Sequence, residues 1–158
     1  MLLPQLPEDS QGPSAKSSGE VFYNPAMAGS RTRSVLLFRH AMEEAMLGDG
    51  TVYALDGLTA SGLRARRWLN ELPCEISSRI SATIVDLEKE ALEWARSSHK
   101  EFPPSDGVGE LQTFQGDLRT AVLSSGRHWI DIDPYGSPAP FIDSAMQSMA
   151  RSGVMEVS

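Results

Sequence analysis

Four aspartates in this chain end or closely follow short apolar runs, and prolines and an aromatic ring accompany the last of them. They are Asp56, Asp86, Asp117 and Asp133, the last lying within D-I-D-P-Y-G-S-P at 131–138. Each run has the length and composition of a strand buried in a sheet. The carboxyl ends of parallel strands meet at one edge of a sheet, and ligands bind at that edge. The sequence therefore predicts a ligand site lined by carboxylates.

Apolar runs and helical periodicity alternate along the chain. Predicted strands cover 51–55, 80–85, 111–114, 129–132 and 154–157, and predicted helices cover 34–47, 63–69, 87–98, 119–123 and 140–150. This alternation indicates an α/β fold with a parallel, doubly wound sheet. Residues 1–20 are rich in Pro, Ser, Gly and Gln and are expected to be disordered or loosely ordered. Residues 21–158 are expected to form one domain.

Composition excludes several classes of protein. The 158 residues are 41% hydrophobic and 22% charged, as in a globular domain, and no apolar run approaches the roughly 18 residues of a membrane span. The start lacks the features of a signal peptide, and the single cysteine, Cys74, rules out an internal disulfide, so a cytoplasmic location is expected. The scattered histidines predict no metal site. The net charge of −7 disfavours non-specific binding of nucleic acid.

The turn at 56–62 suggests which ligand the site holds. It contains neither G-x-G-x-x-G nor the Lys-Ser/Thr of a P-loop, which argues against a pyrophosphate. A nucleoside with a short charged tail fits better. Asp86 ends the second predicted strand, where dinucleotide-binding folds place the acid that binds ribose hydroxyls. Asp117 could accept a hydrogen bond from an adenine amino group, so S-adenosylmethionine is the predicted cofactor.

Asp133 would then face the activated methyl group. We favour Asp133 over Asp131 because it directly precedes Pro134 and Tyr135. The exocyclic amine of a base is a weak nucleophile, and a carboxylate that accepts its N–H bonds can also take its proton. Tyr135 offers the base a stacking surface. These residues predict a methyltransferase acting on a base amine, with adenine or cytosine as alternatives to guanine.

Three segments together resemble the tRNA (guanine(26)-N2)-dimethyltransferase family, in order and in spacing. They are F-Y-N-P at 22–25 with Met27 and Arg31, L-D at 55–56 with A-S-G-L-R at 60–64, and D-I-D-P-Y-G-S-P at 131–138. The resemblance covers 21–157. It implies a class I S-adenosylmethionine-dependent (Rossmann-like) fold and the methylation of N2 of guanosine 26 in tRNA, giving N2-methyl- and N2,N2-dimethylguanosine. The target nucleotide would have to leave its helical stack.

The resemblance also implies a role for each matching residue. Cofactor-binding roles fall on Arg31, Arg64, Asp86, Asp117 and Leu118, the catalytic role on Asp133, and contacts with the base on Phe22 and Tyr135. Members of the family are longer, so the sheet is expected to be incomplete at its C-terminal strands. Binding of tRNA is expected to depend mainly on a C-terminal region absent here. A non-catalytic cofactor-binding or interaction module of the same fold is the alternative.

Overall fold

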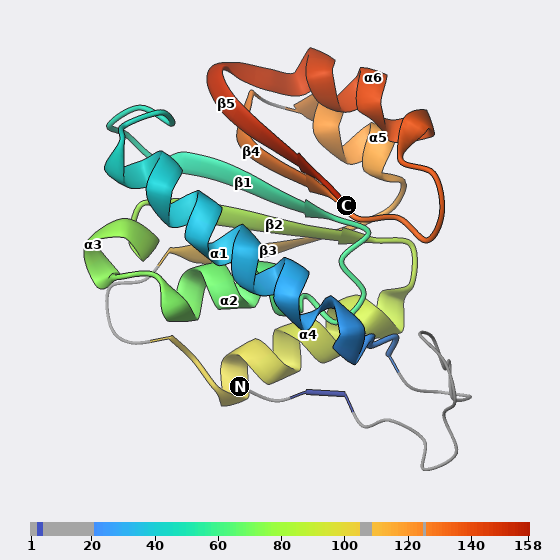
Figure 1. The fold of residues 1–158 in the computed structure, drawn as a ribbon. Coiled ribbons are helices and arrows are strands. Elements are labelled where there is room, and N and C mark those ends of the chain that lie inside the picture. Colours follow the sequence, from blue (N-terminus) through green and yellow to red (C-terminus); the bar gives the residue numbers. More distant parts are fainter. Residues whose placement is uncertain (1–2, 5–20, 105–108, 125) are drawn as a thin grey trace.

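A parallel five-stranded sheet, with strand order β3-β2-β1-β4-β5, organises the part of the chain described by the computed structural model (Figure 1). The described residues are 3–4, 21–104, 109–124 and 126–158. The strands are β1 (Val52–Gly57), β2 (Ile80–Asp86), β3 (Glu110–Gln115), β4 (Arg127–Ile132) and β5 (Met149–Val157). The chain first builds outward from β1 to β3 and then returns to place β4 on the other side of β1. The carboxyl ends of β1 and β4 therefore form the switch point of the sheet, where a crevice is expected.

Helices cover both faces of this sheet (Figure 1). They are the 3-10 turn η1 (Pro25–Met27), α1 (Ala28–Glu43), α2 (Leu63–Glu71), α3 (Cys74–Ser77), α4 (Lys89–Glu101), α5 (Leu118–Ala121), the 3-10 turn η2 (Val122–Ser124) and α6 (Ala139–Ser148). One apolar cluster joins the sheet to α1 through α4, and a second joins it to α5 and α6. The predicted doubly wound α/β fold is confirmed.

Three buried aromatic rings fix α1 and α2 against β4. Phe38 of α1 stacks on Trp129 of β4, with ring centroids 4.4 Å apart, and its edge meets Trp68 of α2 at 5.3 Å. All three side chains are fully buried. Large aromatic groups of this kind dominate core energetics. The helices that carry Arg31 and Arg64 are thereby anchored beside the switch point.

Gly57 ends β1 where no side chain would fit. A Cβ at this position would lie 2.7 Å from Leu118 Cδ2 and 2.9 Å from the carbonyl oxygen of Asp131. Leu118 is itself buried in the apolar cluster on the α5–α6 face. The lack of a side chain at Gly57 therefore lets α5 and β4 pack closely against the end of β1.

Several element boundaries differ from the sequence-based prediction. Helix α1 begins at Ala28 rather than at 34, because η1, capped by the Asn24 side chain, leads directly into it. Strand β5 begins at Met149 rather than at 154. Its first half contains polar residues and pairs with β4 through a bulge, so it does not form the continuous apolar run from which a strand is predicted. Most of the loosely ordered segment predicted for 1–20 lies outside the described residues. In the described ranges no helix is long and apolar enough to cross a membrane.

Candidate active site at the carboxyl ends of β1 and β4

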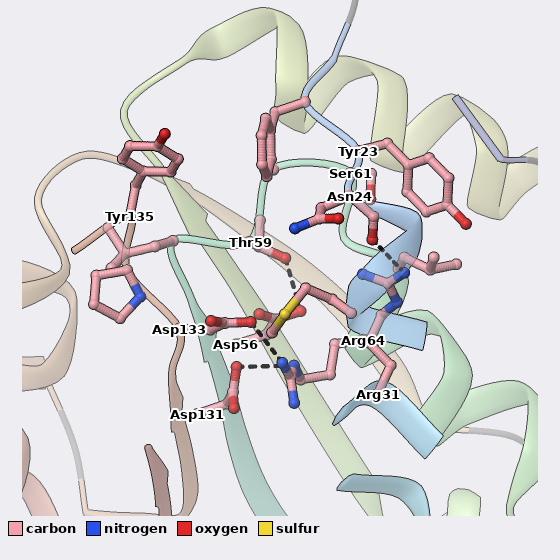
Figure 2. Close-up of a pocket in the computed structure, with 16 residues that line it drawn as sticks. Tyr23, Asn24, Arg31, Asp56, Thr59, Ser61, Arg64, Asp131, Asp133 and Tyr135 are labelled. Atoms are coloured by element: carbon pink, nitrogen blue, oxygen red, sulfur yellow. Dashed lines mark hydrogen bonds and ion pairs between the residues drawn. The ribbon is translucent and has the colours of Figure 1, made fainter. Parts of the chain in front are cut away.

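A cavity of about 680 Å³ opens at the switch point of the sheet (Figure 2). Its walls come from three segments that are distant in sequence: 22–31 at the start of α1, 56–64 between β1 and α2, and 131–135 after β4. They overlap the three segments singled out by motif. The pairing of β1 with β4 and the packing of α1 over both strands bring them together.

Arg64 is the central cation of the cavity floor, and its side chain is only 5% exposed. Its Nε lies 3.1 Å from Asp131 Oδ2, and its Nη2 donates to Asp133 Oδ2 at 2.6 Å. Its Nη1 donates to Glu156 Oε1 at 3.3 Å. A buried guanidinium suits this arrangement because its planar fork presents fixed donors to several carboxylates. Figure 2 shows Asp131, Asp133 and Arg64 converging on one point beneath the cavity.

Asp56 is buried beside this group of charges. Its Oδ2 accepts hydrogen bonds from the Thr59 hydroxyl at 2.7 Å and from the Ala65 backbone N–H at 3.0 Å. Burial raises the pKa of Asp56 to about 6, although the charge of Arg64 acts against the shift. Burial also raises the pKa of Asp131 well above its usual value. The floor of the cavity thus holds more carboxyl groups than one arginine neutralises.

Asp86 holds the loop between β1 and α2. Its Oδ2 accepts from the Ala60 N–H at 2.7 Å and its Oδ1 from the Glu88 N–H at 2.9 Å. Leu58 and Ala60 both adopt left-handed backbone conformations, with φ of 61° and 46°. Strained conformations of this kind are typical of ligand-binding loops. The carboxylate of Asp86 therefore fixes a strained loop that lines the cavity.

Arg31 is held in place by the F-Y-N-P segment. Its Nη2 donates to the Asn24 carbonyl oxygen at 2.9 Å, and its guanidinium lies 5.2 Å from the centre of the Tyr23 ring. The Asn24 side chain in turn accepts from the Ala26 N–H at 3.0 Å and caps η1. Burial lowers the pKa of Arg31. This segment therefore positions a cation on the cavity wall opposite Tyr135 (Figure 2).

A family model described as N2,N2-dimethylguanosine tRNA methyltransferase matches residues 6–158. The chain belongs to this family. It is 29% identical over 159 residues to the tRNA (guanine(26)-N(2)/guanine(27)-N(2))-dimethyltransferase of Aquifex aeolicus, covering 100% of this chain and 38% of that protein. It is 35% identical over 134 residues to the tRNA (guanine(26)-N(2))-dimethyltransferase of Methanoculleus marisnigri, covering 83% and 30%. The chain thus spans about a third of the length of these curated relatives.

Solved structures support the fold. A methyltransferase from Geobacter sulfurreducens superposes with a TM-score of 0.59 at 13% identity, over 82% of this chain and 59% of that one. Coclaurine N-methyltransferase, bound to N-methylheliamine and SAH, gives 0.56 at 11% identity, over 80% and 35%. At these identities the likeness shows the fold alone. The chain has the class I, Rossmann-like methyltransferase fold that the sequence predicted.

Three of the predicted cofactor-binding residues, Asp86, Asp117 and Leu118, do not line the cavity. Asp117 caps α5 by accepting from the Arg119 N–H at 2.8 Å and also binds the Arg119 guanidinium. These hydrogen bonds lower the pKa of Asp117 to about 2. Leu118 is buried in the apolar cluster on the α5–α6 face. Asp117 and Leu118 both follow β3, which is separated from β4 by β2 and β1.

The two aromatic residues predicted to contact the base lie together on the cavity wall. The rings of Phe22 and Tyr135 meet edge to face, with centroids 6.5 Å apart. Tyr135 is 88% exposed, which is far more than a ring serving only the core would be. The residue pair therefore offers an aromatic surface beside Asp133.

The sequence favoured Asp133 over Asp131 as the catalytic acid and did not point to Glu156 as a site residue. In the structure, both Asp131 and Glu156 bind Arg64. Asp131 and Asp133 stand two residues apart, and this spacing places side chains on the same face of a strand. That periodicity could have indicated that both acids reach one site. Glu156 belongs to a strand whose first residues were not predicted, so no signal in the sequence linked it to α2.

Proposed function

We propose that this chain is the catalytic part of a tRNA methyltransferase. It would transfer methyl groups from S-adenosylmethionine to the exocyclic N2 of guanosine 26, giving N2-methyl- and N2,N2-dimethylguanosine. The observation that carries the proposal is the cavity at the switch point, where Asp133 lies between a buried arginine and an exposed aromatic ring. The membership of the dimethyltransferase family supports guanine in tRNA as the acceptor.

The proposed cofactor site follows the carboxyl ends of β1, β2 and β3. Arg31, with Arg64 below it, would bind the methionine carboxylate, and Asp86 would bind the ribose hydroxyls. Adenine would lie near Asp117 and the backbone of Leu118. The strained loop held by Asp86 fits such a ligand because it lets the backbone approach closely. The bound cofactor would supply a methyl group activated by its positive sulfur.

The proposed catalytic residue is Asp133. Its carboxylate would accept the N–H bonds of the guanine amine, which increases electron density on the nitrogen. As the new N–C bond forms and the methyl–sulfur bond breaks, the nitrogen releases a proton, and Asp133 would take it. Arg64 holds Asp133 by a 2.6 Å hydrogen bond and would keep it in the right orientation. Phe22 and Tyr135 would flank the base, which must leave its helical stack to arrive there.

Contacts with the tRNA backbone are expected to come mainly from a region that corresponds to the two thirds of the relatives' length that this chain does not cover. The net charge of −7 on this chain gives little attraction for phosphates. We therefore expect the 158-residue chain alone to methylate tRNA poorly. A cytoplasmic location is part of the same proposal, and the single cysteine is consistent with a reducing compartment.

The test is a methylation assay with a tRNA transcript, followed by mass spectrometry of the nucleosides. The chain would be assayed alone and as a chimera in which it replaces the aligned residues of the Methanoculleus relative, which is named for guanine 26 alone. The expected products are N2-methyl- and N2,N2-dimethylguanosine at position 26, and a transcript with adenosine at 26 should give neither. Methylation of another base would contradict the acceptor. A chimera that binds S-adenosylhomocysteine but methylates nothing would favour a non-catalytic module.

A further inference from the structure

Three carboxyl groups form a row across the sheet beneath Arg64. Asp56 of β1 is the register partner of Asp131 of β4, and Asp131 is the register partner of Glu156 of β5. Register partners in parallel strands direct their side chains to the same face. This face is the one covered by α1 and α2, so all three acids lie under the guanidinium of Arg64. None of these three acids has a role in the proposed reaction, and Glu156 is the one that lies on the edge strand β5.

Both carboxylate oxygens of Glu156 are in use. Its Oε1 accepts from Arg64 Nη1 at 3.3 Å, and its Oε2 accepts from the Ser34 hydroxyl at 2.5 Å. The Ser34 oxygen accepts in turn from Trp68 Nε1 at 3.0 Å, and both of these residues are fully buried. Glu156 is therefore held by α1 at one oxygen and holds Arg64 of α2 at the other.

Arg64 is in turn the residue that holds Asp133. Among the described residues, Asp133 has one hydrogen-bonding partner, and that partner is Nη2 of Arg64. Asp131 fixes the guanidinium at Nε, and Glu156 fixes it at Nη1. These three contacts, with a longer one from Nη2 to the Ser30 hydroxyl at 3.4 Å, set both the position and the rotation of the planar group. Without the contact at Nη1, the guanidinium could rotate about its Nε end and carry Nη2 away from Asp133.

We infer that Glu156 is a positioning residue that orients Asp133 through Arg64. The inference rests on the proposed function only in treating Asp133 as the acid that meets the acceptor amine. Charge and geometry both require a carboxylate at this position, since two donors converge on it. A glutamine has one acceptor oxygen and one amide donor, so it would turn a donor toward either Ser34 or Arg64.

The test is nuclear magnetic resonance on the 158-residue chain, because it needs no turnover. The variants are Glu156→Gln, Ser34→Ala and the matched control Glu43→Gln, which removes an exposed pair with Arg39. Loss of the charge-assisted hydrogen bond at Nη1 should speed hydrogen exchange at the Arg64 Nη1 group by about tenfold or more in Glu156→Gln. The 13C signal of the Asp133 carboxyl should shift in the same variant. Ser34→Ala should change both signals less, and Glu43→Gln should change neither.

Unchanged signals from Arg64 and Asp133 in a folded Glu156→Gln would overturn the inference. If that variant does not fold, Ser34→Ala decides the matter, because it keeps the charge of Glu156 and removes the hydrogen bond that anchors it, together with the acceptor of Trp68 Nε1. Unchanged signals from Arg64 and Asp133 in a folded Ser34→Ala would then overturn the inference. A shift at Arg64 without one at Asp133 would also reject the positioning role. A wild-type chimera that methylates no tRNA, alongside the expected spectral changes, would reject the proposed function and leave the positioning of Asp133 by Glu156 standing.

Discussion

Asp56 of β1 and Asp131 of β4 are register partners in adjacent parallel strands, and both are buried. Two carboxyl groups taken out of water at neighbouring positions oppose each other's ionisation. Arg64 lies against Asp131 at 3.1 Å and offsets part of this cost. The pKa of each acid is nevertheless raised, mainly because of burial. This pair makes the stability of the domain sensitive to pH.

Asp56→Asn should flatten the dependence of stability on pH. The pKa of about 6 in the folded state exceeds the ordinary value of 3.8, so the folded state holds a proton that the unfolded state has released. The contribution of Asp56 is therefore most favourable below pH about 4 and is lost as pH rises to about 6. Relative to Asp56→Asn, the wild-type free energy of unfolding should fall by about 1–3 kcal/mol over this range. Urea titrations at several pH values measure it, with exposed Asp49→Asn as the control. Equal slopes for wild type and Asp56→Asn would contradict the assignment.

Asp133→Ala should remove methyl transfer and spare cofactor binding. Loss of a general base typically lowers a rate by about 10²–10⁴-fold. The affinity for S-adenosylhomocysteine should stay within about threefold, because the proposed cofactor contacts do not include Asp133. Single-turnover tRNA methylation in the chimera and calorimetry on the chain give the two values. Unchanged turnover would take Asp133 out of the mechanism.

Asp86→Asn should weaken cofactor binding. The substitution removes the charge that is proposed to bind the ribose. It also weakens the hydrogen bonds that the Asp86 side chain accepts from the Ala60 and Glu88 N–H groups. A hydrogen bond to a charged group corresponds to about a 10–100-fold change in affinity. Calorimetric titration with S-adenosylhomocysteine checks this, and the exposed variant Glu90→Gln should bind as the wild type does. Equal affinity in Asp86→Asn would place the ribose elsewhere.

Gly62→Ala should destabilise the domain. Gly62 has φ of +62° at the start of α2, and an added Cβ would lie 2.9 Å from Ala95 Cβ. The left-handed conformation alone costs a residue with a side chain about 1–2 kcal/mol. Gly50→Ala is the matched control, since no atom lies within 4 Å of its added Cβ. Urea unfolding compares the two, and similar stabilities would argue against a fixed turn before Arg64.

Arg66→Met should stabilise the chain. Arg66 is fully buried on α2, and none of its guanidinium nitrogens has a hydrogen-bond partner in the described part of the chain. Burial lowers its pKa to about 10, while Trp94, 5.6 Å from the guanidinium, compensates in part. Replacing an unsatisfied buried cation by an apolar chain should raise the free energy of unfolding by about 1–3 kcal/mol. Thermal and urea unfolding test this against exposed Arg96→Met, which should change little. A loss of stability in Arg66→Met would show that Arg66 serves the fold.

Local sequence patterns were sufficient to predict the order of the strands and helices along the chain. Apolar runs that alternate with helical periodicity indicated the parallel sheet, because the two periods differ and each depends on near neighbours. The edge strand β5 was predicted five residues too short, since an edge strand needs no continuous apolar run. The positions of Asp86 and Asp133 at strand ends were also predictable, since a parallel sheet places all those ends at one edge.

The sequence by itself determined the fold class, the family resemblance and the acids that end the strands. Only the tertiary structure decided how those acids are paired. Arg64 meets Asp131, Asp133 and Glu156 because α2 packs against β1 and β2 while the Arg64 side chain reaches the ends of β4 and β5, and these contacts join residues up to 92 positions apart. Such pairings depend on strand register and on helix packing, and neither leaves a local periodic signal. The same reason explains why Asp86, which ends β2, and Asp117, which follows β3 and caps α5, both lie outside the cavity wall.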